Sequence, residues 1–183
     1  MPRPAADRDA FDAVLDQWSA ERPEMNTASL GVVIRIMGLY RTFLRDATRA
    51  LEPTGLELWE YDVLSALRRQ GRPFELSASR LARETDLSTG AMTNRIDRLE
   101  RRGFVRRRTD EVDRRAVRVA LTREGVAKID EAVLHRLEAA DESLQSLAPD
   151  ERDMLAVLLR KVVSDTGTRA VAPEPSREGS VRT

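Results

Sequence analysis

The feature that most constrains this chain is a change of hydrophobic period at Gly103. Before this glycine, Met92, Ile96 and Leu99 recur at the spacing of one helix face. After it, the period changes to two: FVRRRT and AVRVAL are predicted as paired strands, with Val117, Val119 and Leu121 on one face. Glycine is common just past the last residue of a helix. The sequence therefore predicts a helix that is followed at once by a two-stranded hairpin.

Apolar stripes predict further helices on both sides of this boundary. Three are expected early in the chain, over residues 9–20, 28–51 and 57–70. Ser77 and Ser88 are favoured N-cap residues for two short helices that lead to Gly103. Beyond the hairpin, Thr122 caps a long helix, and Pro149 lies near the start of a last one. The expected fold class is mainly α with a small β-hairpin wing.

Positive charge is concentrated between Ser88 and Gly125, which contain eleven arginines and six acidic residues. The whole chain has 31 basic and 31 acidic residues, so the rest of it is net acidic. A basic segment of this kind is the electrostatic footprint of nucleic-acid binding. The alternative is a solvated helix face with internal ion pairs such as Asp97–Arg101. The predominance of arginine over lysine also fits a GC-rich genome.

Helix, turn, helix and hairpin is the order of a winged helix-turn-helix, whose second helix enters the DNA major groove. The residues predicted to contact DNA are Ser88, Thr89, Thr93, Asn94 and Arg98 on this helix, with Arg114 and Arg115 at the hairpin tip. Asn94 can pair bidentately with adenine. Arg98, with Arg101 and Arg102, is expected to meet phosphates. The hairpin is expected over a minor groove, where the negative potential favours arginine.

The composition argues against several other kinds of protein. Cysteine is absent and His135 is the single histidine, so neither a disulfide framework nor a metal site is expected. We find no nucleophile–base pair and no phosphate-binding glycine loop, so we expect neither an enzyme nor a cofactor. The chain has no apolar run of membrane-spanning length and no apolar signal segment near its start. A cytoplasmic protein is the resulting expectation.

The chain resembles the MarR family of bacterial transcription regulators over about residues 28–165. The resemblance is carried by two stretches, STGAMTNRIDRLERRGFVRRR and DEVDRRAVRVALTREG. It implies an intertwined helical homodimer that presents two winged helices to a pseudo-palindromic operator. The implied organisation is an extra N-terminal helix in 1–26, a MarR-type domain in 27–165 and a disordered tail in 166–183. Within that domain, dimerisation helices at 27–52 and 123–165 flank a winged helix at 56–122.

The added N-terminal helix resembles the urate-responsive, PecS-like branch of the family. That resemblance implies a ligand site at Trp18, Asp62, Arg95 and Arg107. An aromatic wall, a carboxylate and guanidiniums suit a flat, weakly acidic purine. Alternatively, Trp18 is a core residue and Asp62–Arg95 a structural ion pair. The predicted function is a repressor that a small aromatic anion, such as urate, releases from DNA; the alternative is a regulator of the same fold that responds to phenolic compounds or has no small-molecule ligand.

Overall fold

The computed structural model describes residues 8–109 and 117–165, and the chain forms two compact units that divide between Asp46 and Ala47. Its elements are α1 (Ala10–Glu21), α2 (Ala28–Ala50), the 3-10 turn η2 (Glu52–Thr54), α3 (Leu58–Arg68), β1 (Glu75–Ser77), α4 (Ala78–Glu84), α5 (Thr89–Arg101), β2 (Val105–Thr109), β3 (Val117–Leu121), α6 (Arg123–Ser143) and α7 (Pro149–Asp165). The predicted helices and the hairpin strands are all confirmed. The predicted tail over 166–183 lies outside the described residues.

The first unit joins α1 to α2 through polar groups at the start of α1. Asp9 is the N-cap of α1, and its carboxylate accepts hydrogen bonds from the backbone amides of Phe11 and Asp12. The carboxylate of Asp12 accepts the backbone amide of Asp9 in return, which completes a capping box. Arg35 on α2 then pairs with both Asp9 and Asp12, at 2.7 and 2.9 Å. One guanidinium therefore fixes the first turn of α1.

Two glycines of α2 let α1 approach closely. A Cβ at Gly31 would lie 3.0 Å from Leu15, and a Cβ at Gly38 would collide with the ring of Phe11. Because Phe11 meets the later glycine and Leu15 the earlier one, the two helices run antiparallel. The extra N-terminal helix is thus packed on its own chain.

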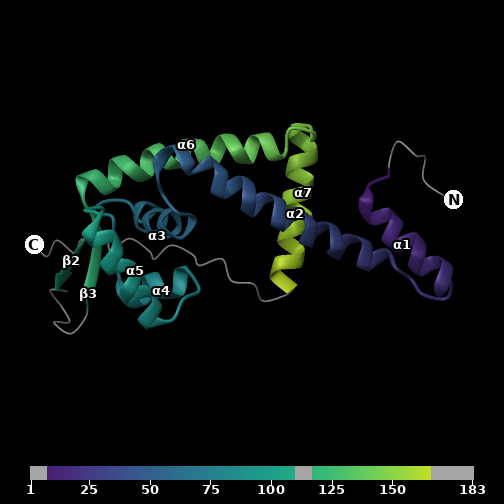
Figure 1. Cartoon of the computed structure of the whole chain (residues 1–183), viewed down its shortest axis with the longest axis horizontal. Coiled ribbons are helices and arrows are strands. Elements are labelled where there is room, and N and C mark those ends of the chain that lie inside the picture. The colour runs from purple at the N-terminus through teal and green to yellow at the C-terminus, as the bar shows by residue number, and fades with distance from the viewer. Residues whose placement is uncertain (1–7, 110–116, 166–183) are drawn as a thin grey trace, which may run out of the picture. The chain divides into compact units, whose positions relative to one another are not determined.

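The second unit has one hydrophobic core, to which α3, α4, α5, α6 and the sheet all contribute. Fully buried side chains include Leu51, Leu64, Leu67, Leu81, Met92, Ile96, Leu99, Val119 and Ile129. Figure 1 shows the helix-turn-helix and the strands near the start of α6, with α7 following from its far end. The predicted stripe of α5 faces this core, so the opposite face of α5 points outward.

The sheet is antiparallel and has three strands in the order β1-β3-β2. Val119 pairs with Leu76 of β1 on one side and with Arg107 of β2 on the other. The hairpin was predicted, but β1 was not, because three residues are too few to establish a period. Val117, expected on the same face as Val119, is the first residue of β3 and is 42% exposed, whereas Val119 is fully buried.

The capping residues predicted for the second unit are confirmed. The hydroxyls of Ser77, Ser88 and Thr122 accept backbone amides in the first turns of α4, α5 and α6. Gly103 has φ +77°, a left-handed conformation that glycine adopts without strain. It ends α5 and turns the chain directly into β2.

Large apolar side chains remain exposed on the long helices of the single chain. They are Leu30, Val33, Met37 and Tyr40 on α2, Leu134 and Leu137 on α6, and Met154, Leu158 and Val162 on α7. Exposed apolar area of this extent is typical of surfaces that bind another protein. Within the described ranges, no helix has the length and apolar character needed to cross a membrane.

Candidate DNA interface and effector site

The outward face of α5 carries the side chains predicted to read bases. Thr89, Thr93 and Asn94 are exposed near the start of the helix, next to the N-cap Ser88. The hydroxyl of Thr93 donates to the carbonyl oxygen of Thr89 at 3.0 Å, so it retains its acceptor lone pairs for a partner. Asn94 presents both a donor and an acceptor. This end of α5 can therefore offer hydrogen bonds in a pattern that matches base edges.

Arg98 lies one turn beyond Asn94 and is held by two residues near the start of α3. Its Nη2 donates to Glu57 Oε1 at 2.8 Å, and its guanidinium carbon lies 4.6 Å from the centre of the Trp59 ring. Trp59 Nε1 donates to the second oxygen of Glu57 at 2.6 Å. The side chain of Arg98 is still 50% exposed. The guanidinium is thus both oriented and accessible.

Arg102 was expected to meet phosphates with Arg98, but the structure gives it partners within the chain. Its guanidinium pairs with Glu60, donates to the carbonyl oxygen of Gly55 at 3.1 Å and stacks on Phe104. The Glu60 side chain is only 1% exposed. Arg102 therefore stabilises the junction between α5 and α3. Its guanidinium is already engaged within the chain, although the side chain is 40% exposed.

Arg107 of β2 also has carboxylate partners, both on α5. Its guanidinium pairs with Asp97 and Glu100, and its backbone amide donates to Glu100 at 2.9 Å. Partial burial opposes its charge, but the hydrogen bonds to the two carboxylates raise the pKa of Arg107. The sequence-based alternative had paired Asp97 with Arg101. In the structure, Arg101 donates to the backbone oxygen of Asp97, at 3.3 Å, and pairs with no carboxylate among the described residues.

Asp62 and Arg95, two of the predicted ligand residues, come close enough for their charges to interact. Asp62 is on an exposed position of α3, but neighbouring protein partly desolvates its carboxyl. This burial raises the pKa of Asp62, and the positive charges of Arg136, Arg95 and Arg69 oppose the rise. Among the described residues, no ion pair within 4 Å joins Asp62 to a cation, so a direct Asp62–Arg95 pair is absent there. Arg95 instead stacks on Trp59, with its guanidinium carbon 5.2 Å from the ring centre.

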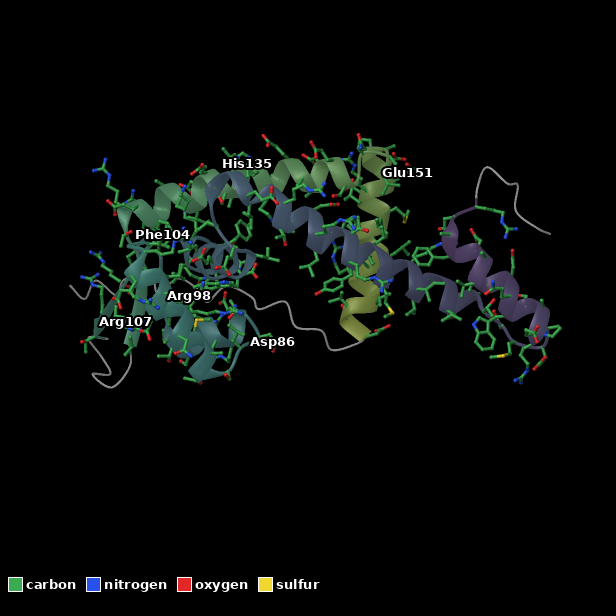
Figure 2. All side chains as sticks on the ribbon, in the orientation of Figure 1. Asp86, Arg98, Phe104, Arg107, His135 and Glu151 are labelled. Carbon is green, nitrogen blue, oxygen red and sulfur yellow. The ribbon has the colours of Figure 1, made fainter. Side chains whose placement is uncertain are left out.

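Three of the four predicted ligand residues belong to the second unit. Asp62 and Arg95 share one region, whereas Arg107 is engaged by Asp97 and Glu100. Trp18 is on α1, in the other compact unit, and is 46% exposed. The wing arginines, Arg114 and Arg115, lie outside the described residues. Figure 2 labels Arg98 and Arg107, which come from α5 and β2 at the same end of the second unit.

Sequence reasoning missed Trp59 and Glu57. The apolar stripe predicts a helix over 57–70 without singling out Trp59. A tryptophan beside a helix stripe, three residues before Asp62, is the signal that could have identified it. Among the residues that the structure describes, no group of three acidic or histidine side chains is arranged to hold a metal ion.

A capped recognition helix, a preceding short helix and a three-stranded wing sheet together define a winged helix-turn-helix protein. The sequence profile of the MarR family matches residues 54–116. The PecS transcriptional regulator of Dickeya dadantii (strain 3937) is 31% identical over 149 residues, which cover 81% of this chain and 90% of that protein. The chain therefore belongs to the MarR family of DNA-binding transcription regulators.

Solved structures agree with this assignment. AbsC of Streptomyces coelicolor, a MarR family regulator, superposes with a TM-score of 0.71 at 22% identity, covering 79% of this chain and 98% of AbsC. BpsR of Bordetella bronchiseptica, whose DNA binding is regulated by 6-hydroxynicotinic acid, gives a TM-score of 0.61 at 28% identity, covering 73% and 98%. These relatives are regulators and not enzymes, as the sequence predicted.

Proposed function

We propose that the chain is a homodimeric repressor that binds a pseudo-palindromic operator and is released by a small aromatic anion, such as urate or a related purine. The observation that carries the proposal is the division of α5 into two faces. Thr89, Thr93 and Asn94 point outward, whereas Arg95 lies beside Trp59 and Asp62 of α3. One helix thus carries both a surface for DNA and an arginine suited to an anion.

The chemistry around Asp62 supports an anionic ligand. Arg69, Arg95 and Arg136 act on one carboxylate, so these four groups have a net positive charge. The negative charge of a planar acid can pair with the guanidiniums while a ring N–H of the same ligand donates to Asp62. Trp18 and Arg107 complete the proposed site. Arg107 would have to exchange its carboxylate partners on α5 for the ligand. The reported effector of BpsR, itself a heteroaromatic acid, makes a ligand of this class reasonable for a relative.

A MarR-type dimer would present two copies of α5 to half-sites about one helical turn, ~10 bp, apart. The exposed apolar residues of α2, α6 and α7 provide the surface for such a dimer. Sedimentation should give a dimer at micromolar concentration. Operator binding should weaken steeply with salt, because phosphate contacts release counterions. A monomer, or binding that is independent of salt, would contradict the proposal.

The effector is tested by gel-shift titration on an operator selected from random DNA by the protein itself. Each protein is titrated with and without urate, and the ratio of the two dissociation constants is compared. A coupling of ~1–3 kcal/mol would give about 5- to 150-fold weaker binding with urate. Trp18→Phe and Asp62→Ala should bring this ratio toward one, and Arg95→Ala should also weaken binding without urate.

A control set of ligands separates the alternatives. Phenolic acids and 6-hydroxynicotinic acid are titrated in parallel with urate and other purines. Release by phenolic acids alone would favour the phenolic reading. If no compound weakens operator binding at millimolar concentration, the proposal is wrong and the protein is a regulator without a small-molecule ligand.

A further inference from the structure

Trp59, Glu57 and Arg98 form a closed triangle of interactions across the junction of α3 and α5. Glu57 accepts the indole N–H through one oxygen at 2.6 Å and the Arg98 guanidinium through the other at 2.8 Å. The third side is the stack of Arg98 on the indole, at 4.6 Å. Each member is thus fixed by both of the others.

The charge of Glu57 persists at neutral pH. The hydrogen bond from Trp59 lowers the pKa of its carboxyl most strongly, burial opposes this lowering, and the charge and hydrogen bond of Arg98 lower the pKa further. The Arg98 interaction is therefore charge-assisted, and the indole face stabilises the same cation. Glu57 uses one N–H of Arg98, and guanidinium has five. The remaining N–H groups can bind a second anion.

The three residues differ in how deeply they are buried. The ring is partly buried and packs against the core of the second unit. Arg98 and Glu57 have side chains that are 50% and 57% exposed. The triangle therefore extends from the core to the surface of the recognition helix. A free arginine there would lose most of its rotamer freedom on reaching a phosphate, whereas a stacked arginine has already lost it.

We propose that Trp59 is a positioning residue for DNA binding, which holds the Arg98 guanidinium ready for an operator phosphate. The inference rests on the proposed function, because it requires Arg98 to contact DNA. Arg101 provides a matched comparison on the same helix. It is exposed, and its described hydrogen bond goes to the backbone of Asp97, with no stack on Trp59.

A double-mutant cycle on operator affinity tests the coupling. Arg98→Ala should weaken binding and lower the slope of log affinity against log salt by about one. Trp59→Leu should weaken binding by about two- to fivefold, the range expected for an exposed cation–π contact. It should have no further effect once Arg98→Ala is present. Trp59→Leu and Arg101→Ala should act independently.

Trp59→Phe guards against a simple folding defect. Phenylalanine keeps a ring face for Arg98, so this variant should bind better than Trp59→Leu and should remain coupled to Arg98. Thermal unfolding monitored by circular dichroism identifies any variant that fails to fold.

The outcomes are distinct. If each Trp59 substitution weakens binding by the same factor whether Arg98 is present or replaced by alanine, Trp59 is only a packing residue. In that case the inference fails while the proposed function stands. If Arg98→Ala changes neither affinity nor salt slope, the placement of Arg98 on DNA is wrong, and the inference falls with it.

Discussion

Arg107 on β2 meets Glu100 on α5 twice, through its backbone amide at 2.9 Å and through its guanidinium. The same guanidinium also pairs with Asp97, one turn earlier on the helix. The first wing strand and the recognition helix are therefore joined by side chains as well as by the turn at Gly103. A ligand that recruits Arg107 would loosen this connection.

Arg107→Ala should reduce the free energy of unfolding by about 1 kcal/mol, because it removes a partly exposed, charge-assisted pair of contacts. It should also weaken operator binding in the absence of any effector, since the wing loses its tie to α5. Urea denaturation and gel shifts measure the two effects. Arg106→Ala, at the exposed neighbouring position, is the control, and equal losses in both variants would count against this role.

The buried carboxylate of Glu60 should make Arg102 important for stability. Glu60 Oε2 accepts both Arg102 and the Glu57 amide, and Oε1 has no hydrogen-bond partner among the described residues. Arg102→Ala leaves a buried charge unpaired, which should cost about 2–4 kcal/mol. Glu60→Gln should cost less, since a neutral amide replaces the charge. Denaturant midpoints show which substitution destabilises the protein more. A larger loss for Glu60→Gln than for Arg102→Ala would contradict this role of Arg102.

Contacts with bases and contacts with phosphates should separate in binding experiments. Asn94→Ala should relax discrimination at particular base pairs by roughly 1–3 kcal/mol each. The double variant Arg114→Ala and Arg115→Ala should weaken binding to all sequences, because wing contacts carry little base information. Selection from random DNA measures the first effect, and affinity for unrelated DNA measures the second. Normal binding by the wing variant would reject the predicted geometry.

The raised pKa of Asp62 predicts a specific pH dependence. A carboxyl whose pKa is higher in the folded state takes up protons on folding, so its contribution favours folding at low pH. That contribution should fall as the pH rises from about 4 through the folded pKa. Effector binding should show the opposite trend, because the proposed site uses ionised Asp62 as the acceptor for a ligand N–H. Asp62→Asn should remove both dependences in melting curves and titrations from pH 4 to 7.

Gly38 should be required for the packing of α1 on α2. A side chain there would collide with the ring of Phe11, so Gly38→Ala should destabilise the docked α1 by about 1–3 kcal/mol. Hydrogen exchange of the α1 amides measures this. Gly90→Ala is the matched control, because a Cβ at Gly90 would meet nothing within 4 Å. Adding Phe11→Leu to Gly38→Ala should restore part of the protection.

Local signals in the sequence were sufficient for most of the fold. Ser77, Ser88 and Thr122 cap helices within a few residues of themselves, and Gly103 acts at its own position. These features need no knowledge of the rest of the chain. The strand β1 could not be found in this way, because it is defined only by pairing with β3, more than forty residues later.

The candidate site was less predictable because its partners depend on three-dimensional packing. The exposed face of α5, with Thr89 and Asn94, follows from helical period. The attachment of Arg107 to Asp97 and Glu100 depends on how the turn at Gly103 folds β2 back on α5. The stack of Arg98 on Trp59 depends on the angle between α5 and α3, which are separated in the sequence by α4. Periodicity predicts on which face of a helix or strand a residue lies, but not which residue of another element it contacts.

The strand order β1-β3-β2 also has a consequence for synthesis of the protein. In the described sheet, β1 and β2 are separated by β3, so each finds its partner only in the last strand to leave the ribosome. The recognition helix is therefore translated before the sheet beside it can form. Until Leu121 has emerged, a nascent chain can hold the helix-turn-helix residues but not a closed winged helix. A regulator built in this way acquires its DNA-binding domain late in its own translation.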